Sequence, residues 1–100
     1  MNKPTNENIS DMAEFFKVFG DPTRMKILLS LLGKEMCVNC ITDTTEVSQS
    51  AISHQLRILR TSGLVKSRRV GKQIYYSLDD DHIKSILEIA HEHVNHKRQV

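Results

Sequence analysis

The sequence predicts a single, mainly α-helical domain with a small β-hairpin, an α+β fold. Three observations support this class: apolar residues recur at helical spacing over most of the chain, two extended runs meet at a glycine near residue 71, and 100 residues are too few for two self-sufficient cores. We therefore expect residues 1–100 to form one domain, with residues 1–8 as a flexible arm and residues 97–100 as a flexible tail.

Three helices are predicted in the first half of the chain. Over residues 9–19, one methionine and three phenylalanines fall on one face at three- and four-residue spacing. Over residues 22–32, Asp21 is a suitable N-cap and Pro22 suits the first helical position. A shorter helix is expected over residues 38–44.

The next helix is predicted from its cap and its apolar stripe. Ser48 is a suitable N-cap and Gly63 suits the C-terminal end. Between them, Ile52, Leu56 and Leu59 recur on one face, which we expect to point inward. The opposite face is polar and basic, with Gln49, Ser50, Ser53, His54, Arg57 and Arg60.

A hairpin and a last helix complete the predicted fold. Two extended runs, residues 64–70 and 73–78, are joined at Gly71-Lys72, a link short enough for a β-hairpin. The tip of this hairpin carries the basic residues Arg68, Arg69 and Lys72. A final helix is expected over residues 80–95.

Positive charge is concentrated in the middle of the chain. Residues 47–78 carry six basic and no acidic residues, whereas the net charge of the whole chain is only +2. Such a block is typical of a surface that meets phosphates, although a solvated basic helix face has the same charge. The order of two short helices, a tight turn and a basic hairpin indicates a winged helix-turn-helix, in which small polar side chains reach base edges and arginines reach phosphates.

Three segments carry a resemblance to a known family: FGDPTR at 19–24, SQSAISHQLR at 48–57 and GLV at 63–65. With them, the chain resembles the ArsR/SmtB family of metal-sensing repressors, most closely the zinc- and cobalt-sensing members. The resemblance implies a homodimer that binds double-stranded operator DNA. Glu46 departs from the family, which often has glycine or asparagine before the recognition helix, and a glutamate would be strained there if the turn needs a positive φ.

The last predicted helix carries a candidate metal site. His82 and His93 are eleven positions apart, which brings them to within about 20° of one direction but separates them by about 16 Å along the helix. Zinc–nitrogen bonds of about 2 Å exclude a site within one helix. Two antiparallel copies could instead join Asp80 and His82 of one chain to His93 and His96 of the other.

The metal is the expected regulatory effector. The same spacing resembles the interhelical site of the zinc- and cobalt-sensing members, so we expect zinc or cobalt and no organic cofactor. Acidic residues at the start of a helix and basic ones at its end also suit the helix dipole without any metal, which is the alternative.

Cys37 and Cys40 form a second, weaker candidate site. The segment EMCVNC is similar to the stretch where cadmium-, lead- and arsenic-sensing relatives carry thiolate ligands, but Asn39 stands where they often have the second cysteine. We favour structural or inert thiols; the alternatives are a second metal site or a redox-sensing role, which would make the chain a thiol-responsive repressor. An enzyme is not expected, because no histidine or acid is placed in sequence to activate either cysteine.

The sequence also bears on location. Its apolar stretches are far shorter than the roughly 20 residues of a membrane span, and its polar start lacks the layout of a secretory signal. We therefore expect a cytoplasmic protein without a membrane partner.

Overall fold

The computed structural model of the chain describes residues 3–99. Its elements are α1 (Asn6–Phe19), α2 (Pro22–Ser30), β1 (Met36–Cys37), α3 (Val38–Thr45), α4 (Gln49–Thr61), β2 (Val65–Val70), β3 (Gln73–Leu78) and α5 (Asp81–Gln99). The mainly helical class with a small hairpin is confirmed, and one strand is added to it. Of the expected arm and tail, residues 1, 2 and 100 lie outside the described residues.

The helices begin where side chains cap them. Asp21 Oδ2 accepts from the backbone N–H of Arg24 at 3.0 Å and starts α2, and Ser48 starts α4 in the same way, both as predicted. The α1 helix begins at Asn6, three residues before its predicted start, because Thr5 forms a capping box with Asn8. The α5 helix extends to Gln99, so both terminal helices are longer than the apolar spacing indicated.

The sheet has three antiparallel strands in the order β1-β3-β2. The β2–β3 hairpin turns at Gly71, whose φ of 61° suits glycine, and pairs Val70 with Gln73 at its tip. The β1 strand, which was not predicted, pairs Cys37 with Tyr75 on the other edge of β3. A strand of two residues is too short to show the alternation by which strands are recognised in a sequence.

A single core joins the helices to the sheet. The predicted inward stripe of α4 is confirmed, since Ile52, Leu56 and Leu59 are all at most 1% exposed. The α5 helix contributes Ile83 and Leu87 to this core, with the partly buried Ile86 packed against it, and all three lie in its first two turns. Most of α5 therefore lies outside the core of its own chain.

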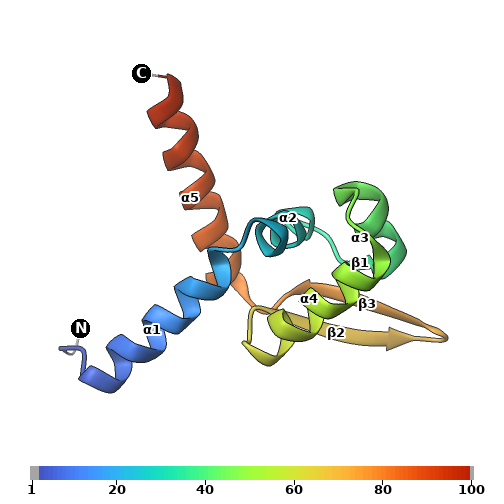
Figure 1. The fold of residues 1–100 in the computed structure, drawn as a ribbon, viewed down its shortest axis with the longest axis horizontal. Coiled ribbons are helices and arrows are strands. Elements are labelled where there is room, and N and C mark those ends of the chain that lie inside the picture. Colours follow the sequence, from blue (N-terminus) through green and yellow to red (C-terminus); the bar gives the residue numbers. More distant parts are fainter. Residues whose placement is uncertain (1–2, 100) are drawn as a thin grey trace.

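Figure 1 shows α2, α3, α4 and the sheet as one body, from which α1 and α5 project in different directions. Large apolar side chains on both projecting helices are at least half exposed: Ile9, Met12 and Phe16 on α1, and Ile89 and Val94 on α5. Among residues 3–99, no helix combines the length and apolar character needed to cross a lipid bilayer.

The turn between α3 and α4 depends on a strained glutamate. Glu46 ends α3 in the left-handed conformation, with φ 60° and ψ 24°, and its N–H donates to the Thr42 carbonyl at 2.9 Å. It is the only non-glycine residue with a positive φ in the described part of the chain. The turn therefore needs the positive φ at which glutamate is disfavoured.

We predict that Glu46→Gly raises the free energy of unfolding by about 1 kcal/mol, the usual cost of a left-handed conformation for an L-residue. Urea denaturation of the two proteins measures the difference. Glu46→Ala is the matched control, because it removes the same charge but keeps a Cβ at the strained position. Equal stabilisation by alanine and glycine would show that charge, and not backbone strain, is responsible.

Candidate DNA interface and metal centre

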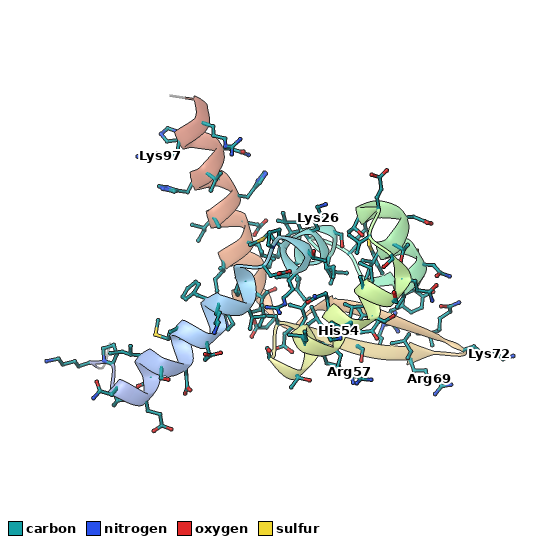
Figure 2. The ribbon with its side chains drawn as sticks, in the orientation of Figure 1. Lys26, His54, Arg57, Arg69, Lys72 and Lys97 are labelled. Carbon is teal, nitrogen blue, oxygen red and sulfur yellow. The ribbon has the colours of Figure 1, made fainter. Side chains whose placement is uncertain are left out.

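The core buries the apolar face of α4, so the polar face of this helix is turned toward solvent. All six side chains predicted to meet DNA on this helix are exposed: Gln49, Ser50, Ser53, His54, Arg57 and Arg60. Figure 2 shows His54 and Arg57 on the same side of the molecule as Arg69 and Lys72 of the hairpin, with Lys26 on the opposite side. The helix and the hairpin thus present polar and basic groups along one edge.

The three basic residues predicted to meet DNA on the hairpin have different surroundings. The Arg69 Nε donates to the Gly71 carbonyl at 3.1 Å, which keeps this side chain at the turn, and Lys72 is exposed. Arg68 instead forms a two-pronged ion pair with Glu35, with Nε 2.8 Å from Oε2, and its guanidinium lies over the Tyr75 ring. The hydrogen bond from Arg68 lowers the pKa of Glu35, so the pair is ionised at neutral pH.

The ion pair was not predicted, because Glu35 and Arg68 are 33 residues apart in sequence. A second distant contact links α2 to the recognition helix α4. The Arg24 Nε donates to Gln55 Oε1 at 2.8 Å across 31 residues. Both contacts tie the polar edge to the rest of the molecule, and neither has a local sequence pattern by which it could be found.

Asp80 and His82 meet at the start of α5. Asp80 Oδ1 accepts from the Ile83 backbone N–H at 3.1 Å, which is the geometry of an N-cap, and Oδ2 lies 3.4 Å from His82 Nδ1. The Ile83 N–H, and then His82, lower the pKa of Asp80, although burial opposes them. Half of the Asp80 side chain and 92% of the His82 side chain are exposed.

This pair fits one edge of a metal site. Two ligands bound about 2.0–2.1 Å from a tetrahedral zinc lie about 3.3 Å apart. The 3.4 Å between Asp80 Oδ2 and His82 Nδ1 matches that edge without any movement. The capping hydrogen bond from Ile83 uses the other carboxylate oxygen, so Oδ2 remains free of that bond and could bind a metal ion.

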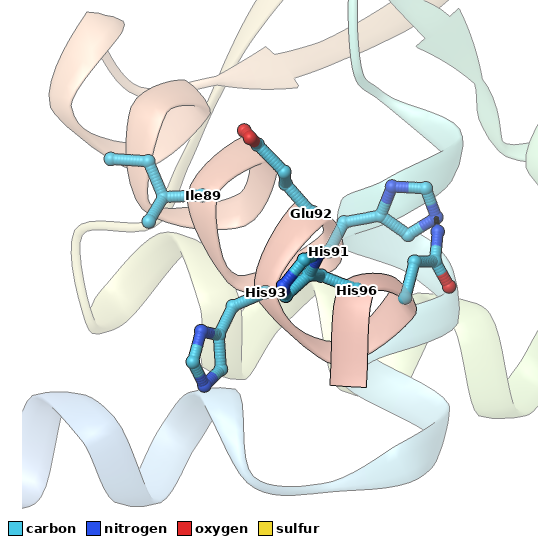
Figure 3. Close-up of a pocket in the computed structure, with 6 residues that line it drawn as sticks. Ile89, His91, Glu92, His93 and His96 are labelled. Atoms are coloured by element: carbon cyan, nitrogen blue, oxygen red, sulfur yellow. Dashed lines mark hydrogen bonds between the residues drawn. The ribbon is translucent and has the colours of Figure 1, made fainter. Parts of the chain in front are cut away.

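The other two predicted ligands lie on the exposed end of α5. His93 and His96 line an open hollow together with Ile89 and His91. Figure 3 shows the His91 side chain directed to one side of the helix, where it meets Asn95 at 3.1 Å, and His93 directed to the other. Within residues 3–99 of one chain, no three His, Cys, Asp or Glu side chains converge to hold a metal ion.

The two cysteines lie where β1 meets α3, and neither belongs to the core. Cys37 is half-buried, Cys40 is exposed, and their Sγ atoms are 3.3 Å apart. The interpretation of structural or inert thiols therefore stays a prediction.

Comparison with known proteins agrees with this geometry. The family described as bacterial regulatory protein, arsR family, matches residues 21–67, from the N-cap of α2 into β2. The chain is 43% identical over 88 residues to the transcriptional repressor SmtB homolog of Synechocystis, covering 88% of this chain and 67% of that protein. It is 45% identical over 89 residues to the cadmium resistance transcriptional regulatory protein CadC homolog of Staphylococcus aureus, covering 87% and 73%.

A solved structure gives the same result for the fold. HlyU from Vibrio cholerae superimposes with a TM-score of 0.81 at 31% identity, covering 88% of this chain and 96% of that one. The shared fold is the winged helix-turn-helix, with α3 and α4 as its helix pair and β2–β3 as its wing. The chain therefore belongs to the ArsR family of bacterial DNA-binding transcriptional regulators.

Proposed function

We propose that this chain is a metal-responsive repressor, which binds operator DNA as a homodimer and releases it when zinc or cobalt binds between the α5 helices of two chains. The observation that carries the proposal is the pair Asp80 and His82, which already has the spacing of two ligands on one ion. The names of the SmtB and CadC homologs support a metal response. The proposal includes a cytoplasmic location.

The proposed DNA contacts follow from the hydrogen-bonding groups and charges of the exposed side chains. Ser53 and His54 lie on the outer face of α4, where short polar side chains reach base edges in the major groove. Arg69 and Lys72 supply positive charge at the wing for phosphates. We assign Arg68 a positioning role, because its charge is balanced by Glu35 and its guanidinium is held against Tyr75.

The exposed apolar faces support a second copy as the partner. Ile89 is 66% exposed and Met12 is 54% exposed, although both are large apolar side chains on well-formed helices. Covering such side chains is favourable by about 25 cal/mol for each Å² of apolar surface. A homodimer formed through α1 and α5 would cover these side chains and bring the opposite ends of two α5 helices together.

In the proposed site, Asp80 and His82 of one chain act with His93 and His96 of the other. Bound zinc would supply a rigid tetrahedral link between the two helices. In this proposal Asp80 transmits that constraint, because its second oxygen caps the helix through Ile83, whose side chain is buried in the core. A changed angle between two α5 helices changes the separation of two recognition helices, which must match about 34 Å of DNA.

Asp80 has two roles that substitution separates. Asparagine also caps helices, so Asp80→Asn should keep the stability of the metal-free protein and weaken zinc binding by removing the charged ligand. Asp80→Ala should weaken zinc binding and also lower the free energy of unfolding by about 1 kcal/mol, because alanine cannot cap the helix. Urea denaturation and zinc titration measure the two effects. Full zinc affinity in both variants would exclude Asp80 as a ligand.

The wing is tested through the salt dependence of DNA binding. Arg69→Ala and Lys72→Ala should each lower the slope of log K against log salt by about 0.9, the value of one phosphate contact. Arg68→Ala should change this slope less, because its charge is already paired with Glu35. Lys26→Ala, on the opposite side of the molecule, is the control and should leave the slope unchanged. Equal slopes in all four variants would remove the wing from the interface.

The shared site is tested with a mixed dimer. His82→Ala and His93→Ala homodimers should each bind zinc weakly and fail to release operator DNA. In a dimer of one His82→Ala chain and one His93→Ala chain, one site lacks both histidines and the other lacks neither. That dimer should therefore regain one tight zinc site, with the cobalt absorption of a tetrahedral nitrogen and oxygen site.

His91→Ala is the matched control for these variants, since His91 lies on the same exposed end of α5 but is directed away from His93. It should bind zinc as the unmodified protein does. If the mixed dimer regains no site, or if each single variant keeps full affinity, the site is not shared between chains.

A further inference from the structure

The two cysteines are already close to the geometry of a disulfide. Their Sγ atoms are hydrogen-bonded at 3.3 Å, and a disulfide needs about 2.05 Å, so the sulfurs have little more than 1 Å to close. Cys37 is the N-cap of α3 and Cys40 lies in its first turn. The C-x-x-C spacing at a helix start brings two thiols together without help from distant parts of the chain.

The two thiols are also chemically distinct. The backbone N–H of Cys40, and then its thiol, lower the pKa of Cys37. The same pairing raises the pKa of Cys40. This difference favours Cys37 as the attacking thiolate and the exposed Cys40 as the thiol that reacts second.

We propose that Cys37 and Cys40 form a redox-sensing site, separate from the α5 ligands, in which peroxide closes a disulfide that lowers the affinity of the protein for DNA. The proposal does not depend on the metal response. It needs only the DNA binding that defines the family and an oxidant of the peroxide class.

The chemistry balances with hydrogen peroxide alone. The Cys37 thiolate attacks one peroxide oxygen, the O–O bond breaks, and the departing hydroxide takes the proton released by Cys37, which leaves a sulfenic acid and one water. The Cys40 sulfur then attacks the Cys37 sulfur, the S–O bond breaks, and the Cys40 proton leaves with the hydroxyl group as a second water. The sulfurs lose two electrons and the peroxide gains two.

The position of the pair connects it to the DNA-binding edge. Cys37 pairs with Tyr75 of β3, and Tyr75 pairs in turn with Arg68 of β2, so the first cysteine lies beside the middle of the wing. Asn39, between the two cysteines, lines a cavity of about 210 Å³ together with Gln49 of α4 and Lys72 of the wing tip. Drawing the sulfurs together would shift the first turn of α3, a helix that packs against both α4 and β3.

A metal site explains the pair less well than a disulfide does. Two thiolates bound about 2.3 Å from a tetrahedral zinc lie about 3.8 Å apart, which is more than the 3.3 Å between these sulfurs. A closed zinc site also needs four ligands, and no third His, Cys, Asp or Glu joins the pair among the described residues.

The experiment uses the full-length protein with a chelator present, so that no metal takes part. Hydrogen peroxide is added in steps, the protein mass is recorded, and operator binding is followed by fluorescence anisotropy. We expect loss of the mass of two hydrogen atoms within one chain, with a fall in DNA affinity of at least about fivefold, the lower end of ordinary coupling between sites. Dithiothreitol should restore both the mass and the DNA affinity. Because both are measured on the unmodified protein, this test does not depend on whether a variant folds.

Variants then assign the roles. Cys40→Ser should accumulate a sulfenic acid on Cys37 that dimedone labels, and Cys37→Ser should react slowly with peroxide. The double variant Cys37→Ser/Cys40→Ser should keep its DNA affinity in peroxide, which also controls for oxidation of the four methionines. The proposal is overturned if both thiols stay reduced, if the disulfide joins two chains, or if it forms and leaves DNA affinity unchanged.

Discussion

The burial of one apolar stripe on α4 is the constraint from which the DNA-binding surface follows. Ile52, Leu56 and Leu59 are essentially inaccessible to solvent, and burying each such side chain contributes roughly 1.5–3 kcal/mol. Because a helix repeats every 3.6 residues, fixing this stripe inward turns the opposite face, with Ser53 and His54, toward solvent. The outward position of these polar side chains needs no further contact to explain it.

Two further helices share this core with α4. The α5 helix enters it through Ile83 and Leu87, with Ile86 packed against it, next to the capped Asp80, and the rest of this helix exposes Ile89 and Val94. On the other side, α3 reaches α4 through the strained turn at Glu46. The proposed metal and redox sites lie at the starts of α5 and α3, and both of these helices have residues in the core that α4 shares.

Local chemistry explains how far the sequence could predict this structure. Caps at Asp21 and Ser48, and the glycine of the wing, are short-range signals, and the elements they predicted are confirmed. The two-residue β1 strand has no periodicity to recognise, and the contact between Glu35 and Arg68 joins residues that only the folded chain brings together. Likewise, spacing along α5 could exclude a one-helix metal site, but the distance between Asp80 and His82 depends on irregular backbone before the helix begins.

Thermodynamic linkage between zinc and operator DNA is the most direct test of a metal-responsive regulator. If zinc weakens operator binding by a given factor, operator DNA must weaken zinc binding by the same factor. Zinc titration of the free dimer and of the dimer on its operator measures both sides of this relation in one experiment. The proposed function predicts a lower zinc affinity on the operator, matched by zinc-driven release of DNA. Identical zinc affinities in the two titrations would contradict it.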